Sequence, residues 1–130
     1  MTYRHAVRVY YEDTDLAGIV YYANYLKFIE RGRSEWVRDL GVDQTALKAE
    51  GLIFAVRRVE ADYFVPAKFD DDLVVETDVA EVGAAKAVVD QRVMRGDTLC
   101  FQAQVTIAMI NDAGRPTRIP ADVRQKMTGN

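Results

Sequence analysis

The acidic residues near the N-terminus are the first whose types and spacing suggest chemistry. Glu12, Asp13 and Asp15 lie within four positions, and Gly18 follows three residues after the last of them. The apolar and aromatic run IVYYANYL (19–26) comes directly after this glycine. A carboxylate can act as a nucleophile or as a general base, and it can also cap the backbone of a turn. The segment therefore predicts either a self-capped turn or a catalytic acid beside an apolar pocket.

An EF-hand calcium loop is one alternative for this segment. Asp13, Asp15 and Gly18 match the first, third and sixth positions of such a loop. Ala17 stands at the fifth position, however, and Asn24 stands at the twelfth, where a bidentate glutamate belongs. No helix is predicted before the loop either, so the sequence disfavours calcium and predicts no metal site.

Two other kinds of catalysis fit the sequence poorly. Phosphoryl transfer through an aspartate nucleophile favours a parallel sheet and a glycine loop that cradles phosphate, and the sequence indicates neither. A catalytic triad would need the single histidine, His5, or the single cysteine, Cys100, and both fall within predicted strands. One cysteine also excludes an intramolecular disulfide.

The composition is that of one globular domain, which we expect to span residues 1–130. The chain is 49% hydrophobic and 28% charged, and its net charge of −3 gives no reason to expect a nucleic-acid partner. The N-terminus lacks an apolar stretch of signal-peptide length, and no run approaches the ~20 apolar residues that span a bilayer. We therefore expect a cytoplasmic protein that does not insert into membranes.

The periodicity of apolar residues predicts an α+β fold. Apolar residues recur at helical spacing from Leu26 to Leu40, with Asn24 as the expected N-cap and Gly41 at the C-terminal end. Gly32 lies on this apolar stripe, where a missing side chain lets another backbone come close. Strands are predicted at Arg4–Tyr11, Phe54–Val65, Leu73–Ala80, Ala87–Met94 and Leu99–Ile110, and short helices after Asp43 and at Pro120–Met127.

Short turns join most of these strands, which predicts an antiparallel sheet. Five such strands would wrap around the long helix, and one helix covers only part of a five-stranded sheet. The arrangement therefore predicts a homo-oligomer.

The loop before the long helix can bind a polarised carbonyl group. The first N–H groups of a helix have no partner within the helix, and together with the helix dipole they stabilise negative charge. During attack on a thioester, one such donor is worth roughly 3–4 kcal/mol in the transition state. An acid across the cleft can attack the carbonyl carbon or activate water, while the aromatic residues hold the acyl group. This hypothesis explains why acids stand next to aromatic residues.

The segment VRVYYEDTDLAGIVYYANYLKFIERGR (7–33) resembles the signature of the hot-dog-fold acyl-CoA thioesterases. Over nearly its whole length the chain is similar to the tol–pal-associated acyl-CoA thioesterases and the related 4-hydroxybenzoyl-CoA thioesterases. YFVPAKFDDDL (63–73) and IPADVR (119–124) match in register with the first motif. The resemblance implies a hot-dog fold, in which a five-stranded antiparallel sheet wraps around one long central helix. It also implies a homodimer or homotetramer that hydrolyses acyl-CoA, with no metal and no organic cofactor.

Carried over by position, the resemblance assigns the catalytic carboxylate to Asp15 and the N–H that polarises the thioester carbonyl to the backbone of Tyr22. Many tol–pal-associated members have histidine at the position of Tyr22, and a backbone role survives that change. We expect Asp13 to cap the loop. The residues expected around the acyl group are Gly18, Val20, Tyr21, Tyr25 and Glu30. A side chain at Gly18 would crowd the approach to the site, and the alternative for the tyrosines is a place in the core. 

Glu30 falls where the hydroxybenzoyl branch has an acid that meets the hydroxyl group of its substrate. The alternative for Glu30 is a solvated carboxylate paired with a neighbouring arginine. That branch also binds CoA phosphates through a basic cluster, which is reduced here to Lys86 in the turn VGAAK (82–86). The other candidates for phosphate contacts are Arg57, Arg58 and Lys68, although for each of them the sequence favours an ordinary surface charge.

The alternative to hydrolysis is a hot-dog protein that binds acyl-CoA or a partner protein without turnover. The presence of Asp15 argues against it. The sequence leaves open whether the acyl group is short, long or aryl, and whether CoA or acyl carrier protein carries it.

Overall fold

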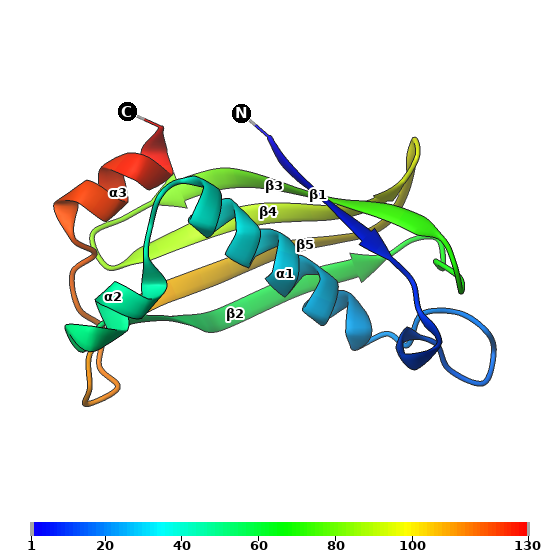
Figure 1. Ribbon diagram of the computed structural model, residues 1–130, viewed down its shortest axis with the longest axis horizontal. Coiled ribbons are helices and arrows are strands. Elements are labelled where there is room, and N and C mark those ends of the chain that lie inside the picture. The colour runs from blue at the N-terminus through cyan, green and yellow to red at the C-terminus, as the bar shows by residue number, and fades with distance from the viewer. Residues whose placement is uncertain (1, 130) are drawn as a thin grey trace.

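The computed structural model describes residues 2–129 and has the α+β architecture that the sequence predicts (Figure 1). One long helix, α1 (Asn24–Asp39), lies across one face of a five-stranded antiparallel sheet. The strands are β1 (Tyr3–Arg8), β2 (Ile53–Tyr63), β3 (Asp72–Val82), β4 (Lys86–Arg95) and β5 (Thr98–Ile110). The shorter helices are the single 3-10 turn η1 (Tyr11–Asp13), α2 (Gln44–Ala49) and α3 (Ala121–Thr128). This arrangement confirms the predicted hot-dog fold.

The order of strands across the sheet places β2 at a free edge. The order is β1-β3-β4-β5-β2, and every neighbouring pair is antiparallel. Helices α1 and α2 separate β1 from β2 along the chain, and these two strands form the opposite edges of the sheet. The outer backbone groups of β2 therefore have no strand beside them within the described chain, and such an edge can pair with a further strand.

The apolar face of α1 packs against the inner face of the sheet. Apolar residues spaced three or four apart share one side of a helix, and alternate residues share one side of a strand. The helix contributes Tyr25, Phe28, Ile29, Gly32, Trp36 and Val37 to this core. The sheet contributes Leu73, Val75, Val89, Val93, Phe101 and Val105. Burial of each large apolar side chain contributes roughly 1.5–3 kcal/mol, so this interface is the main source of stability.

A buried glutamine ties α1 to the sheet at one point. Gln91 on β4 is fully buried, and its amide donates to the backbone carbonyl of Ile29 (2.8 Å) and to the hydroxyl of Thr77 (2.9 Å). Arg33 donates in turn to the Gln91 side-chain oxygen (2.9 Å). Because buried polar groups must keep their partners, these bonds fix the position of α1 along the sheet.

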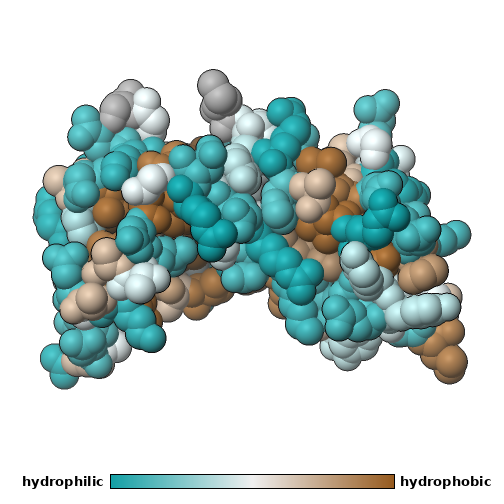
Figure 2. Space-filling model, in the orientation of Figure 1, coloured by the Kyte–Doolittle hydropathy of each residue, from teal (hydrophilic) through white to brown (hydrophobic). Residues whose placement is uncertain are grey.

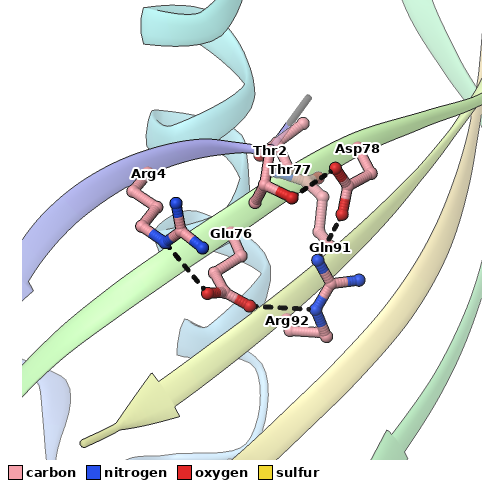
Figure 3. Close-up of polar contacts among 7 residues, drawn as sticks. All are labelled: Thr2, Arg4, Glu76, Thr77, Asp78, Gln91 and Arg92. Atoms are coloured by element: carbon pink, nitrogen blue, oxygen red, sulfur yellow. Dashed lines mark hydrogen bonds and ion pairs between the residues drawn. The ribbon is translucent and has the colours of Figure 1, made fainter.

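The outer face of the sheet is polar and needs no second layer (Figure 3). Arg92 bonds Glu76 (3.1 Å) and Asp78, Arg4 bonds Glu76 (3.2 Å), and Thr2 donates to Asp78 (2.7 Å). Burial alone would raise the pKa of the Asp78 carboxyl, but the hydrogen bonds from Arg92 and Thr2 outweigh it and hold that pKa below its usual value.

The predicted ends of two elements near the acidic loop are wrong. β1 ends at Arg8 rather than Tyr11, because the chain turns into η1 after Tyr10. Asn24 is the first residue of α1, and Ala23 takes the N-cap position predicted for Asn24. The Asn24 side chain bonds back to the loop instead.

The remaining boundaries agree more closely. Asp43 caps α2 as predicted, since its carboxylate accepts the Ala46 N–H (3.0 Å), and Gly41 ends α1 with φ +82°. β2 runs Ile53–Tyr63 rather than Phe54–Val65, and the other strands exceed their predicted spans by at most two residues at an end. Pro120 is the N-cap of α3 rather than its first residue.

We expect Gly32→Ala to destabilise the protein. A Cβ at this position would lie 2.5 Å from Val75 Cγ1 and 3.0 Å from Val75 Cβ. The first distance is shorter than a van der Waals contact allows, so α1 or β3 would have to move. Overpacking costs roughly 1–3 kcal/mol and outweighs the gain of roughly 1 kcal/mol in helix propensity. Urea unfolding should show the loss. Gly83→Ala is the matched control, since a Cβ there meets no heavy atom closer than 3.4 Å; equal stability of the two variants would contradict the packing argument.

Candidate active site

Two loops meet at one end of the sheet and form the site. The first connects η1 to α1, and the second connects β2 to β3 (Figure 1). The Val20 N–H donates to the Ala67 carbonyl (2.8 Å), and Ile19 pairs with Lys68 in an isolated antiparallel bridge. A second bridge, between Thr14 and Val20, closes the first loop on itself. The acidic residues thus lie on a loop that is held at its base.

Asp13 has a structural role, as expected. The residue is only 4% exposed, and its carboxylate accepts the Tyr10 N–H (2.9 Å) and an Asn24 amide hydrogen (3.4 Å). The Asp13 carbonyl also accepts the Tyr21 N–H (2.8 Å), and Asn24 reaches the Glu12 carbonyl (3.3 Å). Asp13 therefore closes the loop from its start to the first residue of α1.

Asp15 differs from Asp13 in that its side chain is exposed. One carboxylate oxygen accepts the Ala17 N–H (2.9 Å), and the Asp15 N–H donates to the Ile19 carbonyl (2.9 Å). Between residues 2 and 129, no protein donor bonds the other carboxylate oxygen. The backbone of Asp15 is thus fixed while one of its oxygens is free to react.

Gly18 is required by the backbone conformation of the loop. Its φ is +79°, a region that residues with a side chain rarely adopt. A Cβ added there would meet nothing within 4 Å. Protein atoms therefore leave the space at this position open, and the conformation of the turn is what requires a glycine.

The start of α1 presents unpaired N–H groups. Neither the Tyr22 N–H nor the Ala23 N–H donates a hydrogen bond within the described part of the chain. The Tyr21 carbonyl accepts the Asn24 N–H (2.8 Å), and the N–H and C=O of one trans peptide point in opposite directions. The Tyr22 N–H is therefore directed away from the helix, where it can bind an acceptor from outside.

Aromatic residues line a cavity of about 270 Å³ beside these N–H groups. Its walls are Ile19, Val20, Tyr22, Tyr25, Tyr63, Phe64, Val65, Pro66 and Cys100. Tyr25 is buried and stacks on Phe101 with ring centroids 4.9 Å apart, and its hydroxyl accepts the Ala67 N–H (3.0 Å). The structure thus brings Val20 and Tyr25 together with Tyr22, as the sequence predicts.

Cys100 lies in the wall of this cavity, whereas Tyr21 lies outside it beside Tyr22. The pKa of the exposed Tyr21 phenol is raised chiefly by its neighbour Tyr22, with a smaller contribution from the charge of Asp15. Burial raises the pKa of the Cys100 thiol. A thiol that is hard to ionise is a poor nucleophile, which agrees with a packing role for Cys100.

A second, more open hollow runs along α1 toward β2. It is about 460 Å³ in volume and is lined by Leu26, Lys27, Ile29, Glu30, Arg33, Val56, Val59 and Val105. Figure 2 shows hydrophobic surface between hydrophilic residues on the side of the molecule that carries α1. Glu30 lies in the hollow and accepts a hydrogen bond from Ser34 (3.0 Å). Glu30 is exposed, as the alternative of a solvated carboxylate predicts, and its charge acts on Arg33, but the described ion pairs include no direct contact between Glu30 and an arginine.

Only one of the four candidate CoA-binding cations adjoins the acidic loop. Lys68 follows Ala67 and pairs with Ile19 in the bridge described above. Arg57 and Arg58 lie in the middle of β2, where Arg58 pairs with Glu60 (2.6 Å). Lys86 begins β4, at the opposite end of the sheet from the loop that carries Asp15 (Figure 1). Lys86 therefore does not meet Asp15 within one chain.

Tyr63 is a residue of the cavity for which the sequence predicted no role in the site. It is the last residue of β2, and its hydroxyl donates to the Tyr22 carbonyl (2.9 Å). The signal was its place at the head of the YFVPAKFDDDL motif, but 41 positions separate the two residues. The pairing of β2 with β5 places Tyr63 beside Phe101, and the packing of Tyr25 from the first turn of α1 on both rings brings Tyr22 to Tyr63.

Neither a cluster of metal ligands nor a membrane-spanning helix is found in the described part of the chain. Residues 2–129 contain no cluster of three or more His, Cys, Asp or Glu side chains that could hold a metal ion. No helix among them has the length and the apolar composition needed to cross a bilayer.

We expect Asp13 and Asp15 to affect stability differently. Asp13→Ala removes a buried acceptor of two hydrogen bonds and should lower the free energy of unfolding by about 2 kcal/mol. Asp15→Asn keeps an oxygen that accepts the Ala17 N–H, so this variant should change the free energy of unfolding by no more than about 0.5 kcal/mol. Urea denaturation measures both, with Asp13→Asn as a milder variant at the same position. If Asp13→Ala were as stable as Asp15→Asn, the structural role of Asp13 would be refuted.

Comparison with known proteins agrees with this geometry. The family model of the thioesterase-like superfamily matches residues 9–127. The acyl-CoA thioesterase YbgC of Haemophilus influenzae is 46% identical over 121 residues, which is 91% of this chain and 88% of that protein. The acyl-CoA thioester hydrolase YbgC of Escherichia coli is 37% identical, over 93% of this chain and 92% of that protein.

A solved structure extends the comparison to three dimensions. The crystal structure of a probable thioesterase from Bartonella henselae superimposes with a TM-score of 0.87 at 39% identity, covering 92% of this chain and all of that chain (100%). The sequence, the strand order and the helix over the sheet thus agree with the same group of proteins. The chain belongs to the thioesterase-like superfamily, among its hot-dog acyl-CoA thioesterases.

Proposed function

We propose that the protein hydrolyses acyl-CoA thioesters to a free acid and CoA at the site between its two loops. The observation that carries the proposal is one juxtaposition. The exposed carboxylate of Asp15 and the unpaired N–H of Tyr22 lie on the same short loop, beside an aromatic cavity. The names of the YbgC relatives, acyl-CoA thioesterase and acyl-CoA thioester hydrolase, support the same activity.

The Tyr22 N–H polarises the thioester carbonyl in this mechanism. The carbonyl oxygen accepts a hydrogen bond from Tyr22 and gains negative charge as the carbon is attacked. A preorganised donor stabilises that charge by roughly 3–4 kcal/mol, because it is already in place when the charge forms. The dipole of α1 acts in the same direction.

Asp15 supplies the attacking group in one of two ways. As a nucleophile, its carboxylate forms an anhydride with the acyl group and displaces CoA as the thiolate, and water then cleaves the anhydride. As a general base, it takes a proton from a water molecule that attacks the carbonyl directly. Both routes use the same free oxygen of Asp15, and neither requires a metal ion or an organic cofactor.

The cavity and the hollow along α1 hold the substrate on either side of the reacting carbon. The aromatic walls exclude water, which strengthens the hydrogen bond from Tyr22. Glu30 faces the hollow one helical turn beyond Leu26 and would contact a polar group of the acyl chain. Lys68 is the candidate for a contact with a CoA phosphate. Since its substrate is an acyl-CoA, we place the protein in the cytoplasm, without a nucleic-acid partner.

A second copy of the chain would complete this site. Val56 and Val59 on the edge strand β2 are 50% and 38% exposed, and Leu26 opposite them on α1 is 42% exposed. Two β2 edges that pair antiparallel would extend the sheet and cover this apolar hollow. We therefore propose a homodimer through β2; a homotetramer would need a further contact surface.

Thiol release from a panel of acyl-CoAs tests the activity. We expect turnover of at least one class among short, long and aryl thioesters, and Asp15→Asn should lower kcat about a thousandfold with the fold intact. The control is Asp39→Asn, an exposed aspartate at the far end of α1, which should retain wild-type activity. Binding of acyl-CoA without thiol release would favour the alternative, a protein that binds acyl-CoA without hydrolysing it. Wild-type activity in Asp15→Asn would remove Asp15 from the mechanism.

Light scattering during size-exclusion chromatography tests the dimer. Val59→Glu puts a charge into the proposed interface, so we expect this variant to be monomeric and to lose activity together with the dimer. Gln102→Glu is the control, because Gln102 is exposed on β5 between buried neighbours and points to the outer face of the sheet. A Val59→Glu protein that stays dimeric and active would rule out this interface.

A further inference from the structure

We propose that Tyr63 is a positioning residue for the attack on the thioester, and that it acts by holding the backbone at the start of α1. The inference rests on the proposed function, because it concerns the same N–H donors. The Tyr63 hydroxyl donates a hydrogen bond of 2.9 Å to the carbonyl oxygen of Tyr22. A residue from the edge strand thus bonds the segment that would bind the thioester oxygen.

Two consecutive peptide groups carry the unpaired N–H groups, and a hydrogen bond holds the carbonyl of each. The first peptide carries the Tyr22 N–H, and its Tyr21 carbonyl accepts the Asn24 N–H (2.8 Å). The second peptide carries the Ala23 N–H, and its Tyr22 carbonyl accepts the Tyr63 hydroxyl. Because a trans peptide is planar, a bond to its carbonyl also sets the direction of its N–H. Tyr63 therefore orients the Ala23 N–H and fixes the torsion angles of Tyr22.

The bond from Tyr63 has an electronic effect as well. A hydrogen bond accepted by the carbonyl of a peptide polarises the whole group and makes its N–H a stronger donor. The Ala23 N–H follows the Tyr22 N–H in the chain and is likewise unpaired among the described residues. Tyr63 thus orients and polarises the Ala23 N–H as a second donor beside the Tyr22 N–H, which the family pattern identifies.

Packing places the Tyr63 hydroxyl before any substrate binds. Its ring makes edge contacts with Tyr25 and Phe101, with centroid distances of 5.5 and 5.0 Å, and with Tyr22 at 6.4 Å. Burial, with a smaller contribution from Tyr22, raises the pKa of the Tyr63 phenol. The hydroxyl accordingly remains a protonated donor throughout the neutral range.

Tyr63→Phe is the substitution that tests the proposal, because it removes one oxygen and leaves the ring in place. Loss of a hydrogen bond that acts on the transition state should lower kcat about tenfold, with KM within about twofold of wild type. Tyr3→Phe is the matched control. Tyr3 lies on β1 near Glu35 and Asp39 at the other end of α1, and its variant should keep wild-type kinetics. A Tyr63→Phe enzyme with kcat within twofold of wild type would overturn the proposal.

Binding of two unreactive analogues separates positioning from a general structural role. The first is S-butyl-CoA, which lacks the carbonyl, and the second is the ketone in which a methylene replaces the sulfur of butyryl-CoA. We expect wild type to prefer the ketone, and Tyr63→Phe to reduce that preference about tenfold while S-butyl-CoA binds as before. Equal losses for both analogues, or an unchanged preference, would overturn the proposal.

The analogue experiment also distinguishes this proposal from the proposed function. If the wild-type protein hydrolyses no acyl-CoA, the proposed hydrolysis fails, yet the two analogues still measure the contact between carbonyl and N–H groups. A ketone preference that depends on the Tyr63 hydroxyl would uphold the positioning role in a binding protein. A wild-type protein that binds both analogues equally, or neither, would overturn it.

Discussion

The buried carboxylate of Asp13 is the constraint on which the loop before α1 depends. A carboxylate removed from water must be hydrogen-bonded, and this one takes its partners from Tyr10 before the loop and Asn24 after it. The loop is thereby closed at its base, and Asp15 is carried outward on a backbone that is already fixed. The dense acidic stretch therefore does not suffer the repulsion that its composition suggests, because one acid is satisfied inside while another faces solvent.

The packing of α1 against the sheet fixes this loop relative to the rest of the molecule. Gly32 lets the helix approach Val75, and Gln91 bonds the Ile29 carbonyl from the sheet, so the helix can neither slide nor turn. Its first residues are consequently held at a set place relative to the end of β2. The Tyr63 hydroxyl at the end of β2 and the Tyr22 carbonyl just before α1 therefore meet in a geometry that the core sets, although both residues lie at the surface.

The sequence was sufficient for the architecture because the buried faces of α1 and the inner strands follow simple periods. It was insufficient where side chains bond the backbone locally: Tyr10 and Tyr11 alternate like a strand, but the cap from Asp13 turns the chain. The motifs identified the loop with Asp15 and the start of α1. They did not indicate that a positive φ is what requires glycine at position 18, or that Lys86 lies at the end of the sheet opposite Asp15. Both facts depend on geometry that only the folded chain provides.

Under the proposed function, pairing of two chains through β2 would explain both the exposure of the Asp15 side chain and the free edge of β2. A carboxylate in full contact with water is well solvated and attacks a carbonyl poorly, so catalysis requires that the site be closed around the substrate. A single chain leaves the hollow between α1 and β2 open, with apolar residues at its rim. Pairing of two β2 edges would cover that rim without disturbing the ion-paired outer face of the sheet. Assembly would then activate the site, since the same contact that buries Val59 would remove water from the neighbourhood of the reacting groups.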